Sequence, residues 1–234
     1  MRNSSFRWVV FLGAALALLV PGAVASASHA EAPGDVPAAP APAEVLWYAD
    51  PALSPARVFD GLERAPGAIT VADDPQGRYG RSFKFETWDH DGGKERCESR
   101  GLRRPDGSVL RINSSMEGQT LYIGWRSLWN PMPNAKGRWL ALFQLHISGR
   151  KSGEPGAGPY VLRTLGDGQL HFQYTPPNGD DRHIWSTPLS LNTWNTFVIG
   201  FRLSRSSSVG WTEFWYNGVQ QRFTTVPLAI PASP

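Results

Sequence analysis

The chain has 234 residues, of which 23 are Lys or Arg, 20 are Asp or Glu, and one is cysteine. The formal net charge is +3, and it falls to +1 when Arg2 and Arg7 are removed with the N-terminal signal described below. A net charge this small excludes the strongly basic surface that is expected of a protein that binds nucleic acid or an acidic membrane. The lone cysteine, Cys97, excludes an internal disulfide, so the hydrophobic core must supply the stability.

The first 27 residues have the pattern of a secretory signal peptide. A basic start at Arg2 and Arg7 precedes an apolar run over residues 8–20, and small residues at 23–27 offer a cleavage site. The run is shorter than the roughly 20 residues that a membrane-spanning helix needs, which disfavours the alternative of a single-pass anchor. The sequence therefore predicts a secreted protein without membrane contact after cleavage.

Composition divides the rest of the chain into three parts. Residues 28–45 are rich in Ala and Pro and are expected to form an extended linker without a core. Residues 46–224 carry most of the aromatic residues and are expected to form one domain, which we expect to be monomeric. Residues 225–234 form a proline-rich tail.

Alternating apolar and polar residues, separated by Gly and Pro, indicate strands throughout this domain, and no long helical period is present. Turn residues at Gly166-Asp167-Gly168 and Asn217-Gly218 predict two hairpins. Many short strands at such spacing favour an all-β fold of two packed antiparallel sheets, a sandwich or jelly roll. The strands are expected at residues 83–88, 121–126, 139–146, 160–165, 169–174, 196–203, 211–216 and 219–224.

Two of these strands carry a polar side. In residues 139–146 the side chains of Trp139, Ala141, Phe143 and Leu145 are expected on one apolar face, with Gln144 and His146 on the other. In residues 169–174, Gln169, His171 and Gln173 share the polar face. These faces either point to water or, if they lie together on one curved sheet, line a binding groove.

A charged cluster lies at Arg96-Cys97-Glu98-Ser99-Arg100. In a strand, Arg96, Glu98 and Arg100 project to one face and Cys97 to the buried side. Guanidinium groups oriented by a carboxylate can bind carboxylate or sulfate oxygens in a bidentate manner. The alternative is a solvated ladder of surface ion pairs.

The pair Gln144 and His146 completes a chemical set. A neutral imidazole can accept a proton near neutral pH, and an adjacent amide can hold a carboxyl group. Together with arginine, these groups suit β-elimination of a uronic-acid polymer, which needs a neutralised carboxylate, a base for the C5 proton and an acid for the departing oxygen.

These motifs resemble those of a known family. Arg96 to Arg100 resembles the Arg-Ser/Thr-Glu-Leu-Arg motif of alginate-lyase-like enzymes, and Gln144-Leu145-His146 resembles their Gln-Ile/Val-His motif. The stretches KERCESRGL, YIGWRSLWNPMP, FQLH, VLRTLGDG, WNTFVIGFRLS and EFWYNGVQQ are similar to secreted bacterial polysaccharide lyases of the heparin lyase I and glucuronan lyase type.

The resemblance implies a concanavalin A-like β-jelly roll that binds an anionic polysaccharide. It implies that Arg96 and Arg100 bind acid groups, that Gln144 neutralises the carboxylate and that His146 transfers a proton. The family closes with a strand that carries a catalytic tyrosine, and no Tyr or Lys follows Tyr216 here. We therefore expect the last strand of the jelly roll to be missing and the lyase site to be incomplete.

Further candidates and alternatives follow from the same residues. Arg126, Arg163, His171 and Gln173 are candidate substrate-binding residues beside Arg100 and Glu98. No cofactor is predicted; residues 89–93 offer oxygen ligands for calcium but lack the spacing of an EF-hand loop. The main alternative function is a lectin-like module that binds acidic glycans without cleavage. A jelly-roll glycoside hydrolase is disfavoured, because Glu86 and Asp89 would face opposite sides of a strand.

Overall fold

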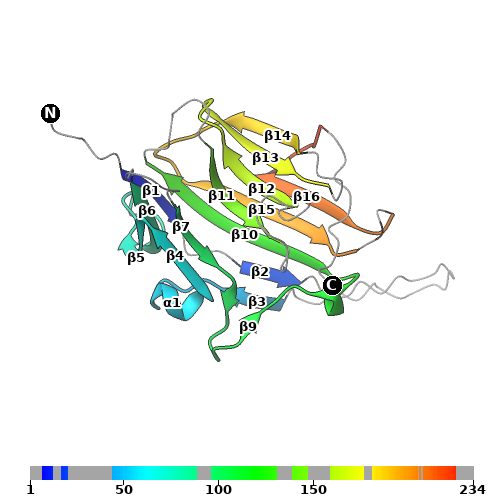
Figure 1. Ribbon diagram of the computed structural model, residues 1–234, viewed down its shortest axis with the longest axis horizontal. Coiled ribbons are helices and arrows are strands. Elements are labelled where there is room, and N and C mark those ends of the chain that lie inside the picture. The colour runs from blue at the N-terminus through cyan, green and yellow to red at the C-terminus, as the bar shows by residue number, and fades with distance from the viewer. Residues whose placement is uncertain are drawn as a thin grey trace, which may run out of the picture.

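The computed structural model describes residues 7–12, 17–20, 44–88, 96–130, 139–146, 159–176, 181–204, 206 and 208–224, and these are almost entirely β (Figure 1). The elements are β1 (Arg7–Leu12), β2 (Ala17–Val20), β3 (Glu44–Tyr48), α1 (Pro55–Val58), β4 (Gly61–Ala65), β5 (Gly67–Asp73), β6 (Arg81–Trp88), β7 (Arg96–Arg100), β8 (Leu102–Arg103), β9 (Val109–Leu110), a short 3-10 helix (Ser114–Met116), β10 (Thr120–Trp129), β11 (Leu140–Leu145), β12 (Tyr160–Thr164), β13 (Gln169–Tyr174), β14 (Arg182–Pro188), β15 (Asn195–Arg202), β16 (Trp211–Tyr216) and β17 (Val219–Gln220).

The largest sheet has the strand order β17-β16-β15-β10-β1-β6-β5, and β2 and β3 continue it beside β10. Its inner face follows the predicted alternation. Leu121, Ile123 and Trp125 of β10 are buried, and so are Phe197 and Ile199 of β15. Since every second residue of these strands is apolar, one face of the sheet is apolar and is buried in the core.

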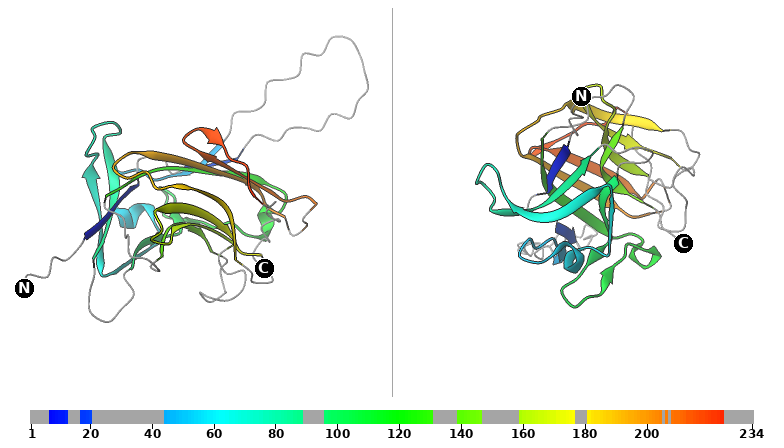
Figure 2. Two further views of the ribbon diagram at one scale, coloured as in Figure 1. Left: turned by 90° about the horizontal axis from the view of Figure 1, so that it is seen from above. Right: turned by 60° about the vertical axis from the view of Figure 1, so that its left-hand side comes forward.

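A second sheet of order β11-β12-β13-β14 packs against the apolar face of the large sheet. Figure 2 shows β12, β13 and β14 as a separate layer against β10, β15 and β16. Stacked rings join the layers: Trp125 lies 4.6 Å from Phe143, and Phe172 lies 4.7 Å from Phe214, measured between ring centroids. The two packed antiparallel sheets confirm the predicted all-β class, and the specific jelly-roll topology stays a prediction.

Two small sheets, β4-β7 and β8-β9, flank this sandwich. The helix α1 ends in Val58 and is followed by Phe59, both buried. The ring of Phe59 packs 5.3 Å from that of Phe83 on β6, so this end of the molecule shares the main core.

The apolar face expected for residues 139–146 is partly wrong. A bulge between Ala141 and Phe143 shifts the register of β11 against β12. Phe143 and Leu145 pack against the core, whereas Ala141 lies opposite Arg163 on the other face and Trp139 is 63% exposed. An extra residue in one strand reverses the alternation on one side of it, and the sequence does not mark where that happens.

Two parts of the N-terminal apolar run, residues 7–12 and 17–20, form strands of the large sheet. β1 pairs with β6 and β10, and β2 pairs with β10 and β3, although this run was expected to contribute no structure. The domain also begins earlier than residue 46, because β3 starts at Glu44. Signal cleavage stays a prediction, and the linker up to residue 43 and the tail 225–234 lie outside the described residues. Within the described chain, no helix is long and apolar enough to cross a membrane.

Candidate functional site

The side of β11–β14 that faces away from the core gathers polar groups. Gln144, Val161, Gln173 and His183 lie opposite one another across the four strands. Arg163 and His171 form the neighbouring row. Directly opposed residues of antiparallel strands share a face. We call the set Gln144, Arg163, His171, Gln173 and His183 the polar face.

His171 is oriented by an aspartate on the adjoining hairpin. Its Nε2 donates to Oδ2 of Asp167 over 2.8 Å, and the backbone N–H of Gln169 donates to the same carboxylate. Burial opposes ionisation of Asp167, but these hydrogen bonds outweigh it and lower the pKa of Asp167. Gly166 and Gly168, both at positive φ, provide the tight turn that brings Asp167 back over β13. This aspartate–histidine pair was missed because Asp167 was interpreted only as a turn residue.

The second nitrogen of His171 has no hydrogen-bond partner among the described residues. Its Nδ1 is buried and makes no hydrogen bond, and the whole residue is 9% exposed. The ring lies 4.6 Å from that of His183 on the next strand. A buried acceptor or donor without a partner costs free energy that a bound ligand group can recover.

Arg163 reaches across β13 to His183. The distance from its Nη2 to Nε2 of His183 is 3.3 Å. A guanidinium only donates, so Nε2 of His183 accepts and the imidazole is neutral. Burial lowers the pKa of His183, and the charges of His171 and Arg163 lower it further. His183 was not among the predicted site residues, because no strand was predicted over residues 182–188.

Arg163 lacks an ion-pair partner among the described residues. Burial lowers its pKa, which the more distant Asp181 opposes, and its Nε is buried without a hydrogen bond. A half-buried cation without a carboxylate is costly unless an anion binds it. Arg163 is therefore the group on this face that most favours an anionic ligand.

Gln173 and Gln144 complete the row. Gln173 is 3% exposed; its Nε2 donates to Thr175 Oγ1 over 3.0 Å, and its Oε1 has no partner in the part of the chain that the structure describes. Gln144 is exposed on β11, whose only described pairing is with β12. His146 is exposed directly after the end of β11. The structure thus brings Arg163, His171, Gln173 and Gln144 onto one face, with His146 at its end.

The arginines of β7 have a different surrounding. Arg96 binds Glu63 of β4 at 2.9 Å and Glu98 at 3.6 Å, and Arg100 binds Glu63 at 3.1 Å. The hydrogen bond from Arg96 lowers the pKa of Glu63 against the effect of burial, and the charges of both arginines add to it. These contacts are the ladder of ion pairs that the sequence offered as the alternative interpretation of this motif. Glu63 was missed because β4 and β7 are far apart in the sequence.

The other candidates, Arg126 and residues 89–93, lie away from the polar face or outside the described residues, and the lone Cys97 lies on β7. The guanidinium of Arg126 lies 4.6 Å from the ring centroid of Tyr79, and Arg126 pairs with Thr196 within the large sheet. Cys97 donates to the carbonyl oxygen of Ala68, and burial raises the pKa of its thiol to about 11, so it is poorly reactive. Residues 89–93, the calcium candidate, lie outside the described residues, and the described part of the chain holds no metal-ligand cluster.

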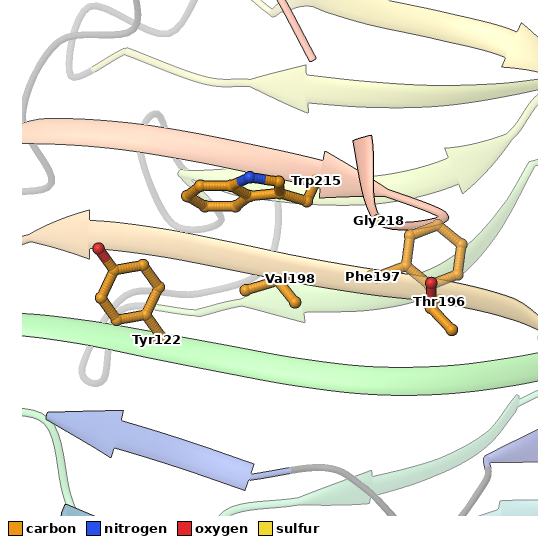
Figure 3. Close-up of a pocket in the computed structure, with 6 residues that line it drawn as sticks. All are labelled: Tyr122, Thr196, Phe197, Val198, Trp215 and Gly218. Carbon is orange, nitrogen blue, oxygen red and sulfur yellow. The ribbon is translucent and has the colours of Figure 1, made fainter. Parts of the chain in front are cut away.

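A hollow on the outer face of the large sheet is chemically different (Figure 3). It has a volume of about 270 Å³ and is lined by Tyr122, Thr196, Phe197, Val198, Trp215 and Gly218. The lining is mostly apolar and contains no charged residue. It offers packing surface and no group for acid–base chemistry at neutral pH.

No protein-family model, curated protein or solved structure matches this chain.

Proposed function

We propose that this protein is a polysaccharide lyase that cleaves a uronic-acid-containing chain by β-elimination at the polar face of β11–β14. The observation that carries this proposal is Arg163, a half-buried cation with no described carboxylate partner. It lies among amide and imidazole groups that suit recognition of a sugar carboxylate.

The reaction needs little from the protein beyond charge and proton transfer. A base removes the C5 proton of the uronate, the bond between C4 and O4 breaks, a C4–C5 double bond forms, and O4 receives a proton from water. Neutralising the carboxylate stabilises the negative charge that develops at C5. Arg163 supplies that charge in this proposal, and the exposed amide of Gln144 holds the carboxylate in place.

His146 is the proposed base. It follows β11 directly, two residues after Gln144, and its side chain is exposed to incoming substrate. Its role rests on the resemblance of the Gln144-Leu145-His146 motif and on this placement. Arg96 and Arg100 are bound to Glu63 on β4 and have no role in this proposal.

The test is an elimination assay on alginate, glucuronan, heparin and hyaluronan, read by the ultraviolet absorbance of the unsaturated product. We expect one of these polymers to be cleaved and His146→Ala to abolish cleavage while leaving binding intact. His29→Ala, in the Ala/Pro-rich stretch, is the matched control and should cleave normally. Unchanged turnover by His146→Ala would remove His146 from the mechanism.

The second candidate function is glycan binding without cleavage. The observation that favours it is that no tyrosine of the described chain lies on the polar face: Tyr160 and Tyr174 of β12 and β13 are buried on the core side. A lectin-like role needs only Arg163 and its neighbours. Retention of one acidic polymer by the protein, together with flat absorbance traces on all four, would select this function over the lyase.

A further inference from the structure

Strands β1 (Arg7–Leu12) and β2 (Ala17–Val20) together take the place of a central strand in the large sheet. Val10 of β1 lies opposite Phe85 of β6 on one side and opposite Trp129 of β10 on the other. Leu18 of β2 lies opposite Ile123 of β10 and Trp47 of β3. Figure 1 shows β1 beside β6 at one end of β10, and β2 beside β3 at the other.

No other described strand joins these partners. β10 pairs with β15 on its opposite edge, β6 pairs with β5, and β3 pairs only with β2. Without β1 and β2 the large sheet would separate into β17-β16-β15-β10, β6-β5 and an isolated β3. Each separated edge would present unpaired backbone N–H and C=O groups beside apolar side chains, which is an unfavourable arrangement in water.

The residues that border β1 and β2 belong to the main core. Trp129 is fully buried, Phe83 is 1% exposed and Trp47 is 3% exposed. Their burial depends on an intact sheet at this place. The predicted cleavage site at residues 23–27 lies beyond Val20, the last residue of β2, so cleavage there would cut the chain without cutting either strand.

We propose that β6, β10 and β3 form an acceptor slot for extended strands and that its occupants are the chain's own strands β1 and β2. Before cleavage these strands fill the slot as part of the chain, and after cleavage they stay as a bound peptide. The N-terminal segment then supplies structural strands as well as an export signal. This inference does not depend on the proposed function.

The first experiment compares residues 28–234 with the full chain, produced without export so that the N-terminus stays intact. Hydrogen exchange should be at least about tenfold faster at the amides of β6 and β10 in the shorter protein, because their edges lose a partner. A synthetic peptide of residues 7–20 with a lysine tail for solubility should restore protection. A scrambled peptide of the same composition should not.

A second experiment uses the full chain and does not require the short protein to fold. Val10→Pro removes a backbone donor in the middle of the slot and should lower Tm by about 4 °C or more. Ala39→Pro, placed in the proline-rich linker, is the control and should leave Tm unchanged. Val10→Pro should also make hydrogen exchange faster at the amides of β6 and β10.

Three results would overturn the proposal. Equal protection of the β6 and β10 amides from hydrogen exchange in residues 28–234 and in the full chain would mean that these strands need no N-terminal partner. Equal effects of the native and scrambled peptides would mean that β1 and β2 are not the occupants. A stable dimer of 28–234 with protected β6 and β10 amides would identify a second copy as the occupant instead.

Discussion

Nη2 of Arg163 and Nε2 of His183 lie 3.3 Å apart, on strands that are separated by β13. The contact places a cation against a neutral imidazole, and His171 lies beside both, with its ring 4.6 Å from that of His183. A face that holds this many basic groups with few carboxylates is costly to the isolated protein and favourable to an anion. The same groups therefore link stability, pH and ligand binding.

The first prediction concerns the stability of the fold in mild acid. Burial and the charges of His171 and Arg163 hold the pKa of His183 below its ordinary value of 6.5, while Asp181 and Asp167 oppose this. Above 6.5 the ring is neutral in both states. As the pH falls through 6.5, the unfolded chain takes up a proton that the folded chain resists, so the free energy of unfolding decreases.

His183→Gln should remove this contribution. Urea unfolding at about pH 7.5 and about pH 5 should show a smaller loss of stability for the variant than for the wild type. His29→Gln is the control and should behave as the wild type does. Identical losses of stability in His183→Gln and wild type would show that the neighbours of His183 do not oppose protonation of its imidazole.

The second prediction concerns Arg163 and acidic glycans. Arg163→Gln removes the cation and keeps hydrogen-bonding capacity, so affinity for an acidic polymer should fall by about tenfold, the value of one charge-assisted contact of about 1.4 kcal/mol. The exposed Arg57 on α1 gives a matched control of equal charge, Arg57→Gln. Both variants would be measured by retention on immobilised polymer across a salt gradient. Equal weakening in both would mean that only net charge matters.

The third prediction concerns Asp74, which organises the loop after β5. Its carboxylate accepts hydrogen bonds from the backbone N–H of Gln76, Arg78 and Tyr79 and from Nε1 of Trp194, over 2.7–3.0 Å. Burial opposes ionisation, but these donors outweigh it and lower the pKa of Asp74. Asp74→Asn replaces one acceptor oxygen by a donor and should cost about 1–3 kcal/mol in urea unfolding.

The exposed neighbour Asp73 supplies the control, because Asp73→Asn should change stability by about 0.5 kcal/mol or less. The difference between the Asp74 variant and wild type should shrink as the pH falls below 3.8 and through the lower pKa of the folded state, where Asp74 of the wild type gains its proton. A neutral outcome for Asp74→Asn near neutral pH would contradict the loop geometry.

The fourth prediction tests the packing on the outer face of the large sheet. A Cβ added at Gly200 would lie 2.5 Å from Cε1 of Tyr122, so the ring would have to move away from Trp211 and Trp215. Gly200→Ala should therefore lower the free energy of unfolding by about 1–2 kcal/mol. Gly124→Ala is the matched control, since its Cβ would lie 3.6 Å from Val198, an ordinary contact.

Local pattern was enough to place several strands. The alternation over residues 169–174 and 211–216 predicts β13 and β16 with the bounds that the structure has, and the glycines of the Gly166–Gly168 turn predict the hairpin before β13. The polar side of β13 could also be predicted, because two neighbouring polar positions, His171 and Gln173, keep the period of two. These are properties of single strands and their adjoining turns.

The sequence by itself determined the all-β class, the positions of β6, β10 to β13, β15 and β16, and the polar residues of β11 and β13. Only the tertiary structure decided which of them meet. In the structure, Glu63 binds Arg96 and the guanidinium of Arg126 lies against the ring of Tyr79. His183 contacts Arg163, and β1 pairs with both β6 and β10. The physical reason is that alternation depends on a few consecutive residues, whereas pairing between distant strands, bulges and register depends on how the whole core closes.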